Sequence, residues 1–266
     1  MNTVFSFGSY YAGSSVIHAL DPRVKFILSC LFIGIVLSAQ DFIGLGCIFA
    51  FVVLFYALAH IPAKRALQSL APLLAIVFIA SILNLFIVQG GNVLISWWII
   101  TISEAGVYQC LFIATRLVLM MMGMSLLTLT TTTLNITEAF ERLLQPLNRF
   151  GVPTHELGMI MGIALRFMPQ FADEFVTVYR AQISRGAKLS HGPLKSLHAL
   201  SSLMVPLFAS AFRHAETLSE AMDARCYHGG EGRTRLHPLH CTAQDGIAAG
   251  VFALLLASVV TLNILI

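Results

Sequence analysis

Two arginines occupy matching places in this sequence, and their chemistry is that of recognition. Arg185 ends an apolar repeat that starts at Leu157, and Arg225 ends a second one that starts at Leu197. In both repeats the apolar residues recur at alternating spacings of four and three, which forms one stripe along a helix. A guanidinium at a helix tip is a rigid fork that suits acidic or carbonyl-lined grooves. The pattern favours docking over catalysis.

A simpler interpretation of each arginine stays open. A cation near a helix C-terminus stabilises the helix dipole, and Gly186 is a natural residue to follow a helix end. However, two helices end in the same way, and each arginine is in phase with the apolar stripe of its helix. The sequence therefore supports docking and simple capping about equally.

The elements that carry these arginines differ in composition from the rest of the chain. Of 266 residues, 57% are hydrophobic and 11% are charged, whereas soluble domains carry about a quarter charged residues. Residues 137–235 hold 20 of the 29 charged residues. We therefore expect an all-α integral membrane bundle with long cytoplasmic amphipathic helices. The predicted domains are a membrane domain (1–133), a cytoplasmic helix module (134–240) and a C-terminal transmembrane helix (241–266).

Five apolar stretches have lengths close to the ~20 residues that a membrane span needs, which predicts about five transmembrane helices. They cover 24–39, 42–59, 70–88, 107–130 and 246–266, while Asn92–Ile102 is predicted to be an interfacial aromatic segment. Lys and Arg flank these stretches on one side only, and the positive-inside rule makes that side cytoplasmic. The N-terminus and the module are predicted cytoplasmic, the C-terminus outside, and the lipid bilayer is an expected partner.

Other polar groups favour structural roles. Arg116, inside the fourth stretch, is expected to contact helix carbonyls or Asn84 rather than form a transport site. Thr128–Thr133 should bond back to the backbone. Pro169 and Pro206 should kink their helices. His237, His240 and Cys241 match no standard zinc spacing, so no metal site is predicted.

Missing motifs restrict the functions further. Gly229–Thr234 is glycine-rich but lacks the P-loop lysine, and a net charge of +3 does not suggest nucleic acid. Two other classes of function remain as alternatives: a membrane-embedded enzyme acting on a lipid or isoprenoid, with Asp173 and Glu174 as the adjacent acidic pair of the module, and a self-sufficient channel or secondary transporter.

Several segments together resemble the transmembrane T component (EcfT/CbiQ-like) of energy-coupling factor (ECF) transporters. They are Gly8–Lys25, Leu143–Leu147, Phe150–Pro153, Ala164–Pro169, Pro206–Arg213 and Ala221–Arg225. The resemblance covers nearly the whole chain, and the two arginine-centred tips are its most specific part. The tips depart from the family pattern at Ser184, where the pattern has Ala, and at Cys226, where it has Gly.

The resemblance implies a non-catalytic coupling subunit of an ATP-driven importer for a micronutrient, a vitamin or a metal ion, in the cell membrane. Two ABC-type ATPase subunits would bind ATP and Mg, and this chain would bind no cofactor. One or more small membrane S components would bind the substrate. The residues expected to dock the ATPases are Ser184, Arg185, Gly186, Ala224, Arg225 and Cys226.

The apolar faces of the two long helices are the expected contact for an S component. Methionines there suit a surface that repacks against varied partners. The alternative is that the same residues pack the two helices on each other. The candidate contact residues are Met159, Met161, Phe167, Met168, Phe171, Leu203, Met204, Phe208 and Phe212.

Overall fold

The computed structural model describes residues 10–11, 13, 15–88, 90, 93–97, 100–186, 193–229 and 242–265. The chain forms two compact units, which we call the membrane unit (Gly8–Ala139 with Pro238–Ile266) and the coupling unit (Phe140–His237 with Met1–Phe7). The unit boundaries fall at residues 139/140 and 237/238, and the predicted domain bounds at 133 and 240 stay predictions. Most of the expected N-terminal arm and His237, His240 and Cys241 lie outside the described residues.

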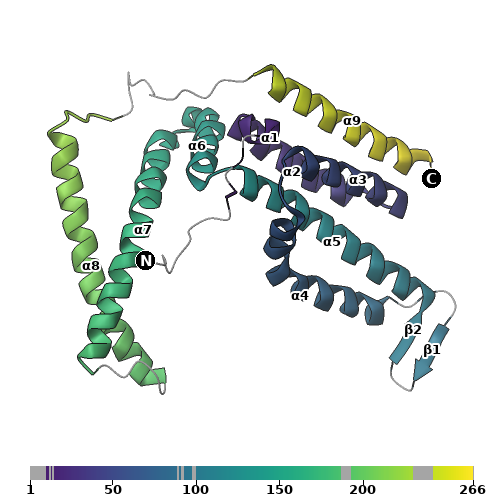
Figure 1. The fold of residues 1–266 in the computed structure, drawn as a ribbon, viewed down its shortest axis with the longest axis horizontal. Coiled ribbons are helices and arrows are strands. Elements are labelled where there is room, and N and C mark those ends of the chain that lie inside the picture. Colours follow the sequence, from purple (N-terminus) through teal and green to yellow (C-terminus); the bar gives the residue numbers. More distant parts are fainter. Residues whose placement is uncertain are drawn as a thin grey trace. The chain divides into compact units, whose positions relative to one another are not determined.

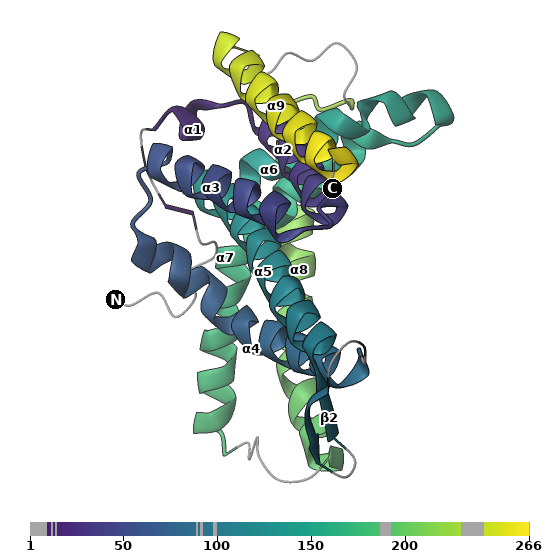
Figure 2. The ribbon, with the colours of Figure 1, turned by 90° about the vertical axis from the view of Figure 1, so that its right-hand side faces the viewer.

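The membrane unit is a bundle of apolar helices (Figures 1 and 2). Helices α2 (Pro22–Ser38) and α3 (Phe42–Leu58) each contact α5 (Glu104–Thr130) and α9 (Ala243–Leu265). Helix α4 (Ala63–Ile87) packs along α5, and the short α1 (Val16–Ala19) contacts α3. The core of this bundle includes the fully buried side chains of Val36, Leu45, Ile48, Leu119 and Val259.

Local signals explain where α2 begins. Asp21 is its N-cap and accepts a hydrogen bond from the Arg23 N–H, and Pro22 occupies the first turn, where its missing N–H costs nothing. This helix opening is the one that the sequence predicts.

Two described helices, α5 and α9, are long and apolar enough to cross a membrane. A third span results if the two parts of α4, Lys64–Ala71 and Leu73–Ile87, count as one despite the 62° bend between them. Pro72 lies at this bend, as expected for a residue that removes a backbone hydrogen bond. Helices α2 and α3, with 17 residues each, stand where two further spans are predicted. The prediction of a helical membrane bundle is confirmed.

A short β-hairpin interrupts the helical pattern between α4 and α5. Strands β1 (Val93–Trp97) and β2 (Ile100–Ser103) pair antiparallel, with Trp97 opposite Ile100. An aromatic interfacial segment without strands was predicted here from Trp97 and Trp98. The β-branched valine, isoleucines and threonine of the segment explain the extended conformation.

The coupling unit begins within α6 (Thr133–Leu144), which starts in the membrane unit, and continues through the 3₁₀ helix η1 (Gln145–Phe150). Helices α7 (Thr154–Ser184) and α8 (Pro193–Asp223) follow, each 31 residues long, and they pack against each other. Pro169 and Pro206 lie inside these helices, as predicted.

Candidate docking site at the helix tips

The end of α7 is shaped by its backbone. Arg185 is the C-cap, and its N–H donates to the Ala181 carbonyl at 3.1 Å. The Gly186 N–H donates to the Ile183 carbonyl at 2.9 Å, and Gly186 takes a left-handed φ of +83°. Glycine adopts this conformation without steric cost, so the helix ends immediately after Arg185.

The end of α8 also places a left-handed residue directly after an arginine, although α8 itself ends at Asp223 and the Arg225 N–H donates to the Met222 carbonyl at 3.1 Å. The Cys226 N–H donates to the Asp223 carbonyl at 2.9 Å, and the Tyr227 N–H donates to the Met222 carbonyl at 3.1 Å. Together these two bonds define a Schellman motif, with Arg225 as C-cap and Cys226 in the left-handed position at φ +54°. Cys226 thus replaces the expected glycine without changing the cap, although a Cβ in this conformation is strained.

Both guanidinium groups are available to a partner. Arg185 and Arg225 are exposed, and neither guanidinium forms a hydrogen bond or ion pair with another described residue. The remaining predicted docking residues, Ser184, Gly186, Ala224 and Cys226, are also exposed. The backbone satisfies the cap, so the side chains are left for other contacts.

The two tips lie at opposite ends of an antiparallel helix pair (Figure 1). The Tyr227 hydroxyl, just after α8, donates to the Met159 sulfur near the start of α7 at 2.8 Å. A helix of 31 residues is about 45 Å long. Arg185 and Arg225 are therefore separated by roughly the length of one helix, which leaves room for a different partner at each end.

An open apolar groove of about 390 Å³, within the size range of small-ligand sites, lies between α7 and α8. Its lining residues are Met168, Phe171, Ala172, Phe175, Met204, Leu207, Phe208 and Ala211. Four of the nine predicted S-component contacts are thus groove residues.

The other five predicted contact residues lie in different surroundings. Phe212 is 73% exposed and Met161 is 39% exposed, whereas Leu203 is only 5% exposed and offers little surface to a partner. Phe167 stacks on the His214 ring, and Met159 accepts the Tyr227 hydroxyl. The apolar stripe therefore serves both interpretations: some members pack inside the chain and others stay exposed.

Sequence reasoning missed a polar cluster next to this groove. His214 follows the spacing of the apolar stripe of α8 in the sequence, yet its Nε2 lies 3.1 Å from the Gln170 amide nitrogen and 3.7 Å from the Glu174 Oε2. A histidine in a stripe of aliphatic residues was the available signal. What it pairs with depends on the packing of α7 on α8.

Arg116 has the structural role predicted for it. Its Nη2 donates to the Ala39 carbonyl, which belongs to the C-cap of α2, and its guanidinium lies 4.5 Å from the centre of the Phe112 ring. The alternative partner, Asn84, donates instead to the Ala80 carbonyl. Arg116 therefore stabilises the C-terminal end of α2.

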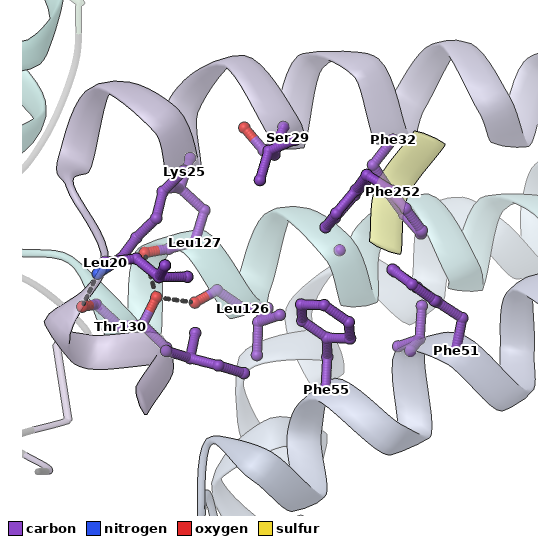
Figure 3. A pocket seen from close by; sticks show the side chains of 14 residues that line it. Leu20, Lys25, Ser29, Phe32, Phe51, Phe55, Leu126, Leu127, Thr130 and Phe252 are labelled. Atoms are coloured by element: carbon purple, nitrogen blue, oxygen red, sulfur yellow. Dashed lines mark hydrogen bonds between the residues drawn. The ribbon is translucent and has the colours of Figure 1, made fainter. Parts of the chain in front are cut away.

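A pocket in the membrane unit is almost wholly apolar (Figure 3). The Lys25 amine reaches its edge but donates to the carbonyls of His18 and Thr130, at 3.1 and 3.3 Å. Thr128 and Thr130 bond back to carbonyls of their own helix, as predicted. The pocket has no array of free polar groups to bind a hydrophilic substrate. Within the described residues, no three His, Cys, Asp or Glu side chains gather into a metal site.

Comparison with known proteins gives a consistent result. Residues 13–236 match a family described as CbiQ, cobalt transport protein. The chain is 41% identical over 244 residues to the energy-coupling factor transporter transmembrane protein EcfT of Clostridium kluyveri, covering 91% of this chain and 90% of that protein. It is 41% identical to EcfT of Acidaminococcus fermentans over 90% of this chain and 89% of the relative. Identity to EcfT of Bacillus subtilis is 38%, over 90% of each chain.

Proposed function

The chain belongs to the CbiQ family and is a non-catalytic transmembrane component of an energy-coupling factor transporter, and from this premise we propose that its two helix tips dock two separate ABC-type ATPase subunits. Arg185 would enter a groove of one ATPase and Arg225 a groove of the other. ATP and Mg would be bound by those subunits, with no cofactor on this chain.

The observation that carries this proposal is the equivalence of the two tips. Each presents an exposed arginine at the C-cap, followed by a residue with left-handed φ. A helix end needs neither an exposed arginine nor a copy at the far end of its partner helix, so dipole stabilisation alone explains the pattern poorly. A planar guanidinium with five donors suits a groove lined by carboxylates or carbonyls.

The apolar groove supports a second contact, with a small membrane S component that binds the substrate. Met168, Phe171, Met204 and Phe208 line it, and Phe208 is 61% exposed. An amphipathic helix or loop of the S component would cover these side chains by helix-in-groove packing. The coupling unit and the N-terminus would face the cytoplasm, where the ATPases find ATP. The imported micronutrient would be a vitamin or a metal ion.

Charge reversal at the tips tests the docking role. The tagged chain is co-expressed with its ATPases, purified in mild detergent, and the ATPase retained per chain is quantified. Reversing a buried charged contact costs about 2–5 kcal/mol, so Arg185→Glu with Arg225→Glu should reduce retention more than about thirtyfold. Each single variant should lose one ATPase.

The matched control is Arg180→Glu. Arg180 is exposed on α7, close to the tip, but five residues from Arg185 and therefore on another face of the helix. It should keep both ATPases. Wild-type retention in the double variant, or an equal loss in Arg180→Glu, would refute docking through the tips.

A further inference from the structure

Helices α7 and α8 correspond to each other at an offset of forty residues. Arg185 corresponds to Arg225, and the left-handed Gly186 to the left-handed Cys226. The Thr177 hydroxyl donates to the Asp173 carbonyl at 2.9 Å, and the Thr217 hydroxyl donates to the Arg213 carbonyl at the same distance. The two helices therefore share a length of 31 residues, an arginine followed by a left-handed residue, and one threonine hydrogen bond at corresponding positions.

The same offset pairs Glu174 with His214, and these two side chains meet. Glu174 stands eleven residues before Arg185, and His214 stands eleven residues before Arg225. Their Oε2 and Nε2 atoms are 3.7 Å apart. In an antiparallel pair, contact between corresponding residues marks the point about which the two helices are related by a local two-fold. Each arginine lies three turns, about 16 Å, beyond this point on its own helix.

His214 has two competing partners on α7. Its Nε2 lies 3.1 Å from the Gln170 amide nitrogen, and its ring stacks on Phe167 at a centroid distance of 6.0 Å. The Glu174 Oε2 is shielded from solvent and has no hydrogen-bond donor in the described structure. A neutral imidazole can accept from Gln170, whereas a protonated one has only donors. Protonation therefore favours Glu174, one helical turn from Gln170.

The other charged groups around this position point elsewhere. On α7, Asp173 is the neighbouring acid, and on α8 Arg213 and Glu216 flank the histidine; all three are exposed. Ser210, one turn earlier on α8, contributes a neutral hydroxyl 3.5 Å from Nε2. Within the described residues, Glu174 is thus the charged group within 4 Å of the ring.

We propose that His214 is a positioning residue for coupling, which sets the crossing of α7 and α8 by choosing between Gln170 and Glu174. With a neutral ring, the hydrogen bond to Gln170 holds the crossing. With a charged ring, the ion pair to Glu174 replaces it and draws the two corresponding residues together. Because both docking arginines lie at the same distance from this contact, a change in the crossing moves the two tips together.

The proposal rests on the docking function above, and the test is chosen to separate the two. The assembled complex is purified, and its ATP hydrolysis is measured from pH 5.5 to 8.5, where imidazoles exchange a proton. His214→Gln keeps a hydrogen-bonding amide but cannot become charged. The ratio of its rate to that of the wild type should change by about threefold across this range, the size expected of a partly exposed ion pair. Glu174→Gln should give a similar change in this ratio. The variant that combines His214→Gln with Glu174→Gln should change the ratio little more than either single variant does.

The control is a second His–Glu pair in the same unit. His155 lies 3.4 Å from the Glu141 carboxylate, near the start of α7 and away from the crossing. His155→Gln should keep a constant ratio to the wild type at every pH. If His214→Gln retains both ATPases and also keeps a constant ratio, the positioning role is wrong while docking stands. If Arg185→Glu with Arg225→Glu retains the ATPases, docking is wrong whatever the His214 variants do.

Discussion

Two helix pairs in this chain are held together in opposite ways. In the membrane unit, α2 and α9 are joined by polar side chains at both ends. In the coupling unit, α7 and α8 share a polar cluster at one crossing point, nearer the C-terminal than the N-terminal end of each helix, and their C-terminal arginines lie beyond it. A pair fastened at both ends is suited to a fixed frame, and a pair fastened chiefly at one interior crossing point is suited to motion of the ends beyond that point.

The bonds of the α2–α9 pair show how firm that frame is. The Asp245 Oδ1 accepts the buried Asp21 N–H at 2.8 Å, while its Oδ2 accepts the Thr242 N–H and hydroxyl at 2.7 and 2.8 Å. At the other end, the Asn263 amide donates to the Ser38 carbonyl at 2.6 Å. The α7–α8 pair has a weaker bond near one end, because the Met159 sulfur that accepts the Tyr227 hydroxyl is a poor acceptor.

Of the changes considered, removal of the Asp245 carboxylate should weaken the α2–α9 pair the most. Asp245→Ala leaves the buried Asp21 N–H and the Thr242 N–H without acceptors, which should lower the free energy of unfolding by about 2–4 kcal/mol. Thermal unfolding of the purified chain in detergent would measure this loss. Asp245→Asn, which keeps one oxygen, should lose less than half as much. Arg185→Ala, in the coupling unit, should leave the unfolding midpoint unchanged. An equal loss of stability in Asp245→Ala and Arg185→Ala would contradict the contrast between a fixed pair and a pair with free ends.

A smaller effect is expected at the other end of α2. Asn263→Ala removes the bond to the Ser38 carbonyl from an exposed position, which should cost about 1 kcal/mol. Hydrogen exchange of the last turn of α2 should become faster, with little change in the first turn. Thr261→Ala is the matched control, because the Thr261 hydroxyl donates to the Ser258 carbonyl within α9 and, among the described residues, to no group on α2. Unchanged exchange in Asn263→Ala would mean that α9 does not hold this end of α2.

The smallest expected effect is that of replacing Cys226, the left-handed residue after Arg225, with glycine. Cys226→Gly relieves a left-handed conformation that costs an L-residue about 1–2 kcal/mol, part of which is offset by the greater freedom of glycine in the unfolded chain. The last turn of α8 should therefore exchange its amides about twofold to fivefold more slowly, a gain of roughly 0.5–1 kcal/mol. ATPase retention should not change. Faster exchange would contradict the Schellman cap at this tip.

Local features of the sequence predicted much of this structure. The apolar spacing placed α7 and α8, Asp21 and Pro22 marked the start of α2, and the two arginines were recognised at the ends of their helices. Each of these signals depends on residues within a few turns of one another, so it can be read without knowing the fold.

Features that depend on distant residues escaped prediction. The bond from Asp21 to Asp245 joins residues 224 positions apart, and the contact of Glu174 with His214 requires the packing of α7 on α8. Periodicity also could not separate Leu203, which is buried, from Phe208, which is exposed, because both are apolar and the sequence does not show which side of α8 another helix covers. The hairpin of β1 and β2 was missed because Trp97 and Trp98 in the sequence suggested a membrane interface.

The equal spacing of the two arginines from the Glu174–His214 contact has a mechanical consequence. Two arms that cross at one point and extend equally far beyond it move their tips by equal amounts for a given change of the crossing angle. A chain with tips at unequal radii would trade displacement against force between its two partners. With equal radii of about 16 Å, neither partner has the longer stroke, and the torques that they apply count equally.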